Sequence, residues 1–219
     1  MSSAILKDKP IKRKYDSSRR QAQARSTKMQ IAEVARNLFF ERGYEGATIE
    51  AIAEDAGVAK ETVYSIFRNK QSILAFLLDV SVGGDDLPLP IIQRPGPQAI
   101  LVDTDQRRQI SKFAQEAGEI LSRAAALFAI MSSAADTEPE ISIRIQELHK
   151  LRLKNMTSVV HHIAGNGPLQ AGLDEKRAGE TVWALTSPEL FNLLKTELGW
   201  SREEYAEWLA DILIRVLLP

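Results

Sequence analysis

The sequence of 219 residues contains no cysteine and no long apolar run. Without cysteine, neither a disulfide framework nor a thiolate metal site can form. No stretch approaches the roughly 18 uninterrupted apolar residues that a transmembrane helix needs. The N-terminus is basic but lacks the apolar run of a secretory signal. We therefore expect a cytoplasmic protein that has no membrane partner.

Recognisable catalytic motifs are missing as well. The sequence has no HExxH, no P-loop, no GxSxG nucleophile elbow and no GxGxxG. Its only histidines are His149, His161 and His162. Adjacent helical residues point about 100° apart, so His161 and His162 are poorly placed to hold one metal ion. The sequence predicts no enzyme activity, no catalytic or metal-binding residue and no cofactor.

Strand signals are nearly absent, whereas helical spacing of apolar residues recurs along the whole chain. The pattern predicts an all-α protein. Expected helices cover about 27–42, 48–56, 59–67, 70–80, 104–134, 139–164, 174–186, 188–197 and 201–218. Gly118 is a candidate break in the fifth helix. Thr186 and Ser201 are the expected N-caps of the last two. The segment 81–98, with four prolines and three glycines, predicts a loop.

Charge is divided unevenly between the two parts of the chain. Residues 1–70 carry 14 Lys and Arg against 9 Asp and Glu, and the remaining residues are acidic. The first 28 residues hold nine basic side chains, opposed only by Asp8 and Asp16. Such asymmetry suggests that the N-terminal part meets a polyanion. The basic N-terminus is either a solvated tail or an arm that lies along nucleic acid.

A helix-turn-helix pattern stands between Ile52 and Phe67, in the sequence IAEDAGVAKETVYSIF. Two short helices that cross closely need a small residue at the crossing, a turn residue that tolerates positive φ, and apolar residues that lock the second helix. Ala53, Gly57, Val58 and Val63 supply these in order. The exposed side of the second helix then carries polar side chains of mixed type.

The segment from Met29 to Leu78 resembles the DNA-binding domain of TetR-type transcriptional regulators. Its core reads MQIAEVARNLFFERGYEGATIEAIAEDAGVAKETVYSIFRNKQSIL. The resemblance is carried by Ala35, Leu38, Phe39, Gly43, Tyr44, Thr48, Ile52, Ala53, Ala56, Gly57, Val58, Thr62, Val63, Tyr64, Phe67 and Lys70. The run from Trp183 to Leu218 also resembles the closing helices of one subset of this bacterial family.

The resemblance implies a DNA-binding set of six residues: Thr48, Lys60, Glu61, Thr62, Tyr64 and Lys70. Side chains at the start of the second motif helix would reach base edges in the major groove. Thr48 would place its hydroxyl and the helix N-terminus toward a phosphate while also serving as an ordinary N-cap, and Tyr64 and Lys70 match positions that usually hold phosphates. Glu61 is equally well explained as a first-turn acid that favours the helix dipole. Ile66 departs from the family, which often has an aromatic residue or histidine at that position.

The expected domains are an N-terminal arm over 1–27, a helix-turn-helix domain over 28–72 with its motif at about 48–67, and a helical effector-binding and dimerisation domain over 73–219. The family dimerises through its last two helices. The predicted homodimer interface comprises Tyr205, Trp208, Leu209, Ile212 and Val216, whose apolar stripe is alternatively explained by core packing. The predicted effector pocket comprises Phe113, Phe128, Met131, Met156 and Trp183, each of which also suits plain core.

Together these observations predict a dimeric regulator that binds a palindromic double-stranded DNA operator and is a repressor released by an unknown small-molecule effector. The alternative is a helical small-molecule-binding or adaptor protein that does not bind an operator. Sequence-specific binding to DNA would discriminate between the two.

Overall fold

A computed structural model describes residues 17–219, and every regular element in that range is helical, as predicted. The elements are α1 (Ser17–Gly46), α2 (Ile49–Asp55), α3 (Lys60–Phe67), α4 (Lys70–Gly83), the 3₁₀ helix η1 (Ile91–Gln93), α5 (Pro95–Leu101), α6 (Gln106–Ala134), α7 (Pro139–Gly165), α8 (Glu175–Leu185), α9 (Pro188–Leu198) and α10 (Arg202–Leu217). Residues 1–16 of the predicted arm lie outside the described residues.

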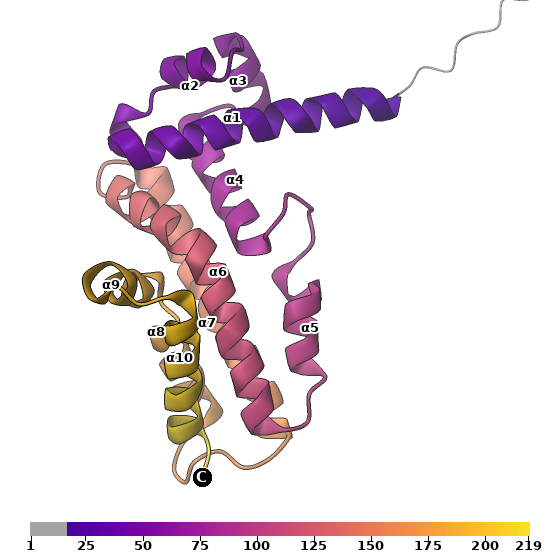
Figure 1. The fold of residues 1–219 in the computed structure, drawn as a ribbon, viewed down its shortest axis with the longest axis vertical. Helices are drawn as coiled ribbons and strands as arrows, with labels where there is room; N and C mark the ends of the chain where they lie inside the picture. Colours follow the sequence, from indigo (N-terminus) through magenta and orange to yellow (C-terminus); the bar gives the residue numbers. More distant parts are fainter. Residues whose placement is uncertain (1–16) are drawn as a thin grey trace, which may run out of the picture.

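The N-terminal head consists of α1, α2 and α3, with α4 leading away from it into the body (Figure 1). Its core is built from the apolar stripe of α1 and the inner faces of the short helices, including Ile31, Phe39, Ile52 and Val63, all at most 1% exposed. Burial of these side chains holds the two short helices against α1, since an isolated helix of seven or eight residues is not stable in water.

Helix α1 begins at Ser17, about ten residues before the predicted start. Residues 17–27 of the expected arm are therefore helical. Residues 18–26 are mostly polar and exposed, so the stretch carries no apolar stripe from which a helix could be predicted. Gly43, where the sequence predicts a stop, does leave the helical conformation with a φ of 69°.

Helix α4 belongs to the head and to the body at once. Its buried residues Ile73, Leu74, Leu77 and Leu78 lie in the same apolar cluster as the head. That cluster also includes the C-terminal part of α6, so the expected domain boundary at 72–73 falls inside a shared helix rather than in a linker. We call this set of buried residues the head cluster.

The segment 81–98 was expected to be a loop, but it contains η1 and the start of α5. Pro95 and Pro97 fall in the first turn of α5, where a missing backbone N–H costs nothing because the first four N–H groups of a helix have no internal partner. The prolines therefore mark a helix start here and not a break.

The body is organised around α6, which runs from the bottom of the molecule to the head (Figure 1). Gly118 does not break it: the helix is continuous from Gln106 to Ala134. A β-carbon at Gly118 would lie 3.5 Å from that of Ala206 on α10. The glycine therefore serves close packing of α6 against α10. Buried residues of α6, α7, α8 and α10, including Ile110, Val160, Val182 and Leu209, form a second core, which we call the body cluster.

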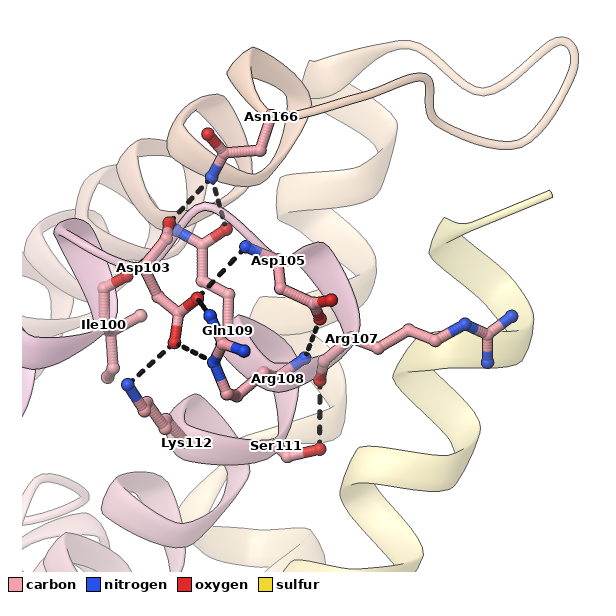
Figure 2. Close-up of polar contacts among 9 residues, drawn as sticks. All are labelled: Ile100, Asp103, Asp105, Arg107, Arg108, Gln109, Ser111, Lys112 and Asn166. Carbon is pink, nitrogen blue, oxygen red and sulfur yellow. Dashed lines mark hydrogen bonds and ion pairs between the residues drawn. The ribbon is translucent and has the colours of Figure 1, made fainter.

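Polar side chains fix the corner between α5 and α6 (Figure 2). Asp103 is 6% exposed and accepts hydrogen bonds from Arg108 and Lys112, with Nη2 and Nζ at 2.6 and 2.7 Å. Gln109 is fully buried and donates to the carbonyl of Ile100 at 2.9 Å. Asn166, at the end of α7, donates to Gln109 Oε1 at 3.0 Å, so three helices are joined at this corner.

The predicted N-cap of α10 is confirmed, whereas the N-cap of α9 differs from the prediction. Ser201 and Glu204 form the predicted capping box of α10. Helix α9 is capped by Ser187, whose hydroxyl accepts from the Leu190 N–H at 3.1 Å, and not by Thr186. Thr186 instead ends α8, where it is 5% exposed and its hydroxyl donates to the Val182 carbonyl.

Within residues 17–219, no helix combines the length and apolar character that a bilayer span requires.

Candidate nucleic-acid interface and effector cavity

The turn between α2 and α3 has the geometry that the sequence predicts. Gly57 adopts a φ of 64°, in the left-handed region that favours glycine. The Val58 N–H donates to the Ala53 carbonyl at 3.0 Å, which closes the turn. Ala53 and Val63 are at most 3% exposed, so they fix the angle between the two helices. The orientation of the outer face of α3 is therefore set by buried packing.

Three of the predicted DNA-binding residues, Lys60, Glu61 and Tyr64, lie exposed on α3, with Tyr64 48% exposed. Thr62 is partly buried on the same helix. Lys60 Nζ lies 2.8 Å from Glu50 Oε1 on α2, and this hydrogen-bonded pair raises the pKa of Lys60 and lowers that of Glu50. Lys60 is thus paired with a partner that is itself exposed.

Thr48 precedes α2 and is its N-cap, as predicted. Its hydroxyl accepts a hydrogen bond from the Ala51 N–H at 3.1 Å. The side chain is exposed, so the helix N-terminus that it caps is open to solvent. Free N–H groups at a helix N-terminus favour an anion such as a phosphate.

Lys70 opens α4 and turns back toward α1. Its ammonium donates to the Tyr44 carbonyl at 2.7 Å and lies 4.0 Å from the centroid of the Tyr44 ring. Partial burial lowers the pKa of Lys70. Ile66, where the family often has a polar contact, is partly buried and packs against the head cluster, which accounts for an apolar residue there.

Two contacts of the head were not predicted from the sequence. Arg25 on α1 forms an ion pair with Asp86, with Nε 2.6 Å from Oδ2, and Asp86 belongs to the segment between α4 and η1. Lys28 Nζ lies 4.0 Å from the centroid of the Phe76 ring on α4. Both contacts join residues that are far apart in sequence, and nothing in the local pattern pairs them.

The body contains a cavity of about 490 Å³. Its wall is contributed by α4, the segment 87–101, α6, α7 and the junction of α8 with α9. Phe113, Phe128 and Met156 of the predicted pocket line it. Met131 and Trp183 do not: Met131 is 2% exposed inside the head cluster, and Trp183 packs against His149 on α7. The spacing of apolar residues could not show which face of each helix meets the cavity.

Four charged side chains also line the cavity: Asp79, Arg94, Glu116 and Arg152. Burial raises the pKa of Asp79 and of Glu116, because the charged carboxylates are poorly solvated. Burial likewise lowers the pKa of Arg152. Arg94 is paired with Asp85 at 3.0 Å. The cavity is therefore apolar with a few charged groups, which is the usual composition of a small-molecule site.

The predicted dimer stripe on α10 divides into two faces. Tyr205 and Leu209 are at most 1% exposed and belong to the body cluster, so they cannot face a partner. Trp208 and Ile212 are partly buried, and Val216 is 39% exposed. These last three residues are four apart and lie on one side of the helix. Tyr205 lies on the inward face of α10, where its hydroxyl donates to the Leu185 carbonyl at 2.9 Å, so Tyr205 and Leu209 belong to the core and not to the exposed stripe.

The head, with its glycine turn, its buried crossing and its exposed polar third helix, defines a helix-turn-helix protein. Residues 31–76 match the family model described as "Bacterial regulatory proteins, tetR family". The N-terminal part of the chain therefore matches the DNA-binding domain of the TetR family.

Two relatives in sequence are similar to this chain over a short stretch. The Fatty acid metabolism regulator protein of Bacillus subtilis is 39% identical over 61 residues, which are 28% of this chain and 31% of that protein. The HTH-type transcriptional regulator TtgR of Pseudomonas putida is 39% identical over 61 residues, 28% of this chain and 29% of that protein. The chain thus matches about a third of the length of these relatives.

Solved structures resemble the chain over most of its length. NalD of Pseudomonas aeruginosa, described as the secondary repressor of the MexAB-OprM multidrug efflux pump, has a TM-score of 0.67 at 22% identity, over 89% of this chain and 98% of that one. FadR of Bacillus subtilis in complex with stearoyl-CoA has a TM-score of 0.65 at 21% identity, over 85% of this chain and 97% of that one. At these identities the likeness concerns the fold.

Proposed function

We propose that this protein is a sequence-specific DNA-binding transcriptional regulator, a dimeric repressor that a small molecule releases from a palindromic operator. The observation that carries the proposal is the outer face of α3, where Lys60, Glu61 and Tyr64 are exposed while Val63 and Phe67 anchor the helix beneath them. A rigidly held polar helix of this kind enters the major groove.

The chemistry of the exposed residues suits base edges and phosphates. Lysine donates to guanine O6 and N7, threonine bonds to several bases or touches the thymine methyl, and glutamate accepts from cytosine N4. Lys60 is free to take this role because its partner Glu50 is itself exposed. On DNA we expect Lys60 to exchange the carboxylate of Glu50 for a base or phosphate oxygen.

One head reads only a half-site, so tight and selective binding requires two heads related by a two-fold axis. The partly exposed stripe of Trp208, Ile212 and Val216 on α10 is the proposed contact with the second copy. Leu193 and Leu198 on α9 are 56% and 63% exposed and add apolar surface to the same end of the chain.

Ligand release is supported by the place of the cavity. Helices α4 and α6 line it, and both also contribute to the head cluster. Leu87 belongs to the cavity wall, next to Asp86, which is paired with Arg25 of α1. A ligand that fits the cavity better in one head orientation would shift the equilibrium toward that orientation. NalD is described as a repressor, and FadR was crystallised with stearoyl-CoA, which agrees with this proposal.

DNA binding is tested with fragments that flank the coding region of the protein, by fluorescence anisotropy at several salt concentrations. We expect selective binding to one fragment, and a Thr62→Val variant with altered sequence preference, since only the hydroxyl is lost. Lys195→Gln on α9 is the matched surface control and should bind as the parent does. Equal loss on all sequences would refute base reading by Thr62, and no selective binding at all would favour the adaptor alternative.

The dimer is tested by sedimentation at micromolar concentration. We expect the parent to be dimeric and Val216→Asp to shift it toward monomer, because a charge is placed in the proposed contact. Val102→Asp is the control: Val102 is 75% exposed at the far end of α5. Trp208→Asp is a less clean probe, since Trp208 also contacts Trp200, with ring centroids 5.7 Å apart. A monomeric parent would contradict the proposal.

A further inference from the structure

Arg152 on α7 lines the cavity with part of its guanidinium unpaired. Its Nη2 donates to the carbonyls of Trp183 and Thr186, at 3.2 and 2.9 Å. Its Nη1 is buried without a hydrogen-bond partner. Among residues 17–219 no carboxylate lies within ion-pair distance of this guanidinium. A cationic group in this state is costly unless something else supplies the anion.

The residues that contact Arg152 supply no anion to it. Arg152 Cζ lies 5.5 Å from the centroid of the Trp183 ring, and the rings of His149 and Trp183 are 5.8 Å apart. Trp183 Nε1 and His149 Nδ1 are also buried without a hydrogen-bond partner. Three polar nitrogens without partners thus belong to residues in mutual contact where α7 meets α8. Of these three residues only Arg152 lines the cavity, so a ligand in the cavity can complete the guanidinium but not the two ring nitrogens.

The other charged groups of the wall have another way to be neutralised. Arg94 has Asp85, and Asp79 lies 3.8 Å from Arg144. Glu116 is partly buried and, as a carboxyl group whose pKa burial raises, can take up a proton. An arginine does not lose its proton in a protein. The charge that a ligand must balance is therefore the positive one of Arg152.

Most of the remaining wall is apolar. It includes Leu78 on α4, Phe113 and Phe128 on α6, and Met156 one helical turn after Arg152 on α7. Asn155 and Thr186 lie in the same wall and supply further polar groups. A ligand that matches both features has one anionic head and a flexible or flat apolar body.

We propose that the cavity binds an amphipathic monocarboxylate, with the carboxylate on Arg152 and the apolar chain between α4 and α6. This assignment rests on the proposed function only in that it names the chemical class of the effector. The carboxylate would accept from the guanidinium at the point where α7, α8 and α9 meet. Ligand binding would thus connect these helices to α4 and to the segment after α4, in which Asp86 is paired with Arg25 of α1.

Binding is measured first with the unmodified full chain by isothermal titration calorimetry, without DNA and below the micellar concentration of each probe. Dodecanoate, dodecylamine and dodecan-1-ol share the apolar chain and differ only in the head. We expect dodecanoate to bind on the order of tenfold or more tightly than the alcohol, as a charge-assisted hydrogen bond requires. Equal binding of the alcohol, tighter binding of the amine, or binding of dodecanoyl-CoA in place of the free acid would overturn the proposal.

The role of Arg152 is then tested by substitution. Arg152→Gln should weaken dodecanoate by about tenfold to a hundredfold and leave dodecan-1-ol unchanged, whereas Arg152→Lys should restore part of the loss. Lys154→Gln removes an exposed charge from the same helix and should change neither affinity. Circular dichroism checks the fold of each variant, and the comparison of probes on the parent chain stands if Arg152→Gln fails to fold.

The two proposals can fail separately. Addition of dodecanoate to the complex with operator DNA should release the DNA. Tight binding of dodecanoate without release would leave the ligand class in place and refute ligand-released repression. Release of the DNA by another class of molecule, with no binding of dodecanoate, would refute the ligand class and leave ligand-released repression in place.

Discussion

Substitution of Gly57 tests whether the turn between α2 and α3 depends on backbone conformation alone. Its φ of 64° lies in the left-handed region, and an added β-carbon would meet no atom within 4 Å. Steric clash therefore contributes nothing to the cost. A non-glycine residue in this conformation costs about 1–2 kcal/mol, and the stiffer unfolded chain returns about 0.4–1 kcal/mol. We expect Gly57→Ala to lower the free energy of unfolding by about 1 kcal/mol.

The measurement is urea denaturation followed by circular dichroism. Gly57→Asn should cost less than Gly57→Ala, because asparagine tolerates the left-handed region. Gly165→Ala is a control of opposite sign. Gly165 also has no atom within 4 Å of an added β-carbon, but it ends α7 in helical conformation, so alanine there should stabilise slightly.

Two results would refute the reasoning about Gly57. A Gly57→Ala variant as stable as the parent would mean that the turn relaxes away from positive φ without cost. A loss above about 3 kcal/mol would mean that the turn holds contacts beyond its dihedral angle. If Gly57→Ala lowers the free energy of unfolding by about 1 kcal/mol, its affinity for DNA should fall further than the small unfolded fraction explains, since the turn sets the direction of α3.

Two further predictions concern charge. Lys70→Ala should weaken binding to all DNA sequences and reduce the slope of log K against log salt by ~0.9; an unchanged slope with lower stability would show that Lys70 only holds Tyr44. Asp103 has a pKa well below its usual range, because Arg108 and Lys112 donate to it. Its contribution is therefore complete above the unfolded pKa of about 3.9 and is lost as pH falls below that value. Denaturation between pH 7 and pH 2 should show a smaller acid-dependent loss for Asp103→Asn than for the parent or for Asp211→Asn; equal loss in all three would exclude this role for Asp103.

The head was largely predictable because its signals are local. Gly57 and the N-cap Thr48 act within a few residues of their positions, and the stripe through Ile31 and Phe39 repeats at helical spacing. Ser201 and Glu204 likewise predict the start of α10, because a capping box spans only four residues. Each of these predictions depends on short-range geometry, and the structure has each one in place.

Other features depend on contacts that the sequence does not display. The extension of α1 to Ser17 has no apolar stripe, and Pro95 reads as a loop residue unless the helix start is already known. Thr186 and Ser187 are adjacent cap residues of similar propensity, so their order could not be decided locally. Gly118 is explained only by the approach of Ala206 on another helix.

The candidate sites divide in the same way. The polar face of α3 follows from the motif, but the pairing of Lys60 with Glu50 and of Lys70 with Tyr44 comes from tertiary structure. In the cavity, helical spacing placed Met131 and Phe128 on related faces, although only Phe128 reaches the wall. Arg152 gave no sequence signal, because its significance lies in tertiary structure: within residues 17–219 no carboxylate forms an ion pair with its guanidinium.

Helix α6 contributes to both clusters: Leu127 and Met131 lie in the head cluster, and Ile110 and Leu121 lie in the body cluster. The head therefore finishes its own hydrophobic core with residues that come much later in the chain. A chimera that joined this head to the body of another regulator would inherit a mismatched surface under α4. Exchange of reading heads between such proteins has to carry the C-terminal part of α6 along, and the natural unit for recombination is larger than the DNA-binding motif.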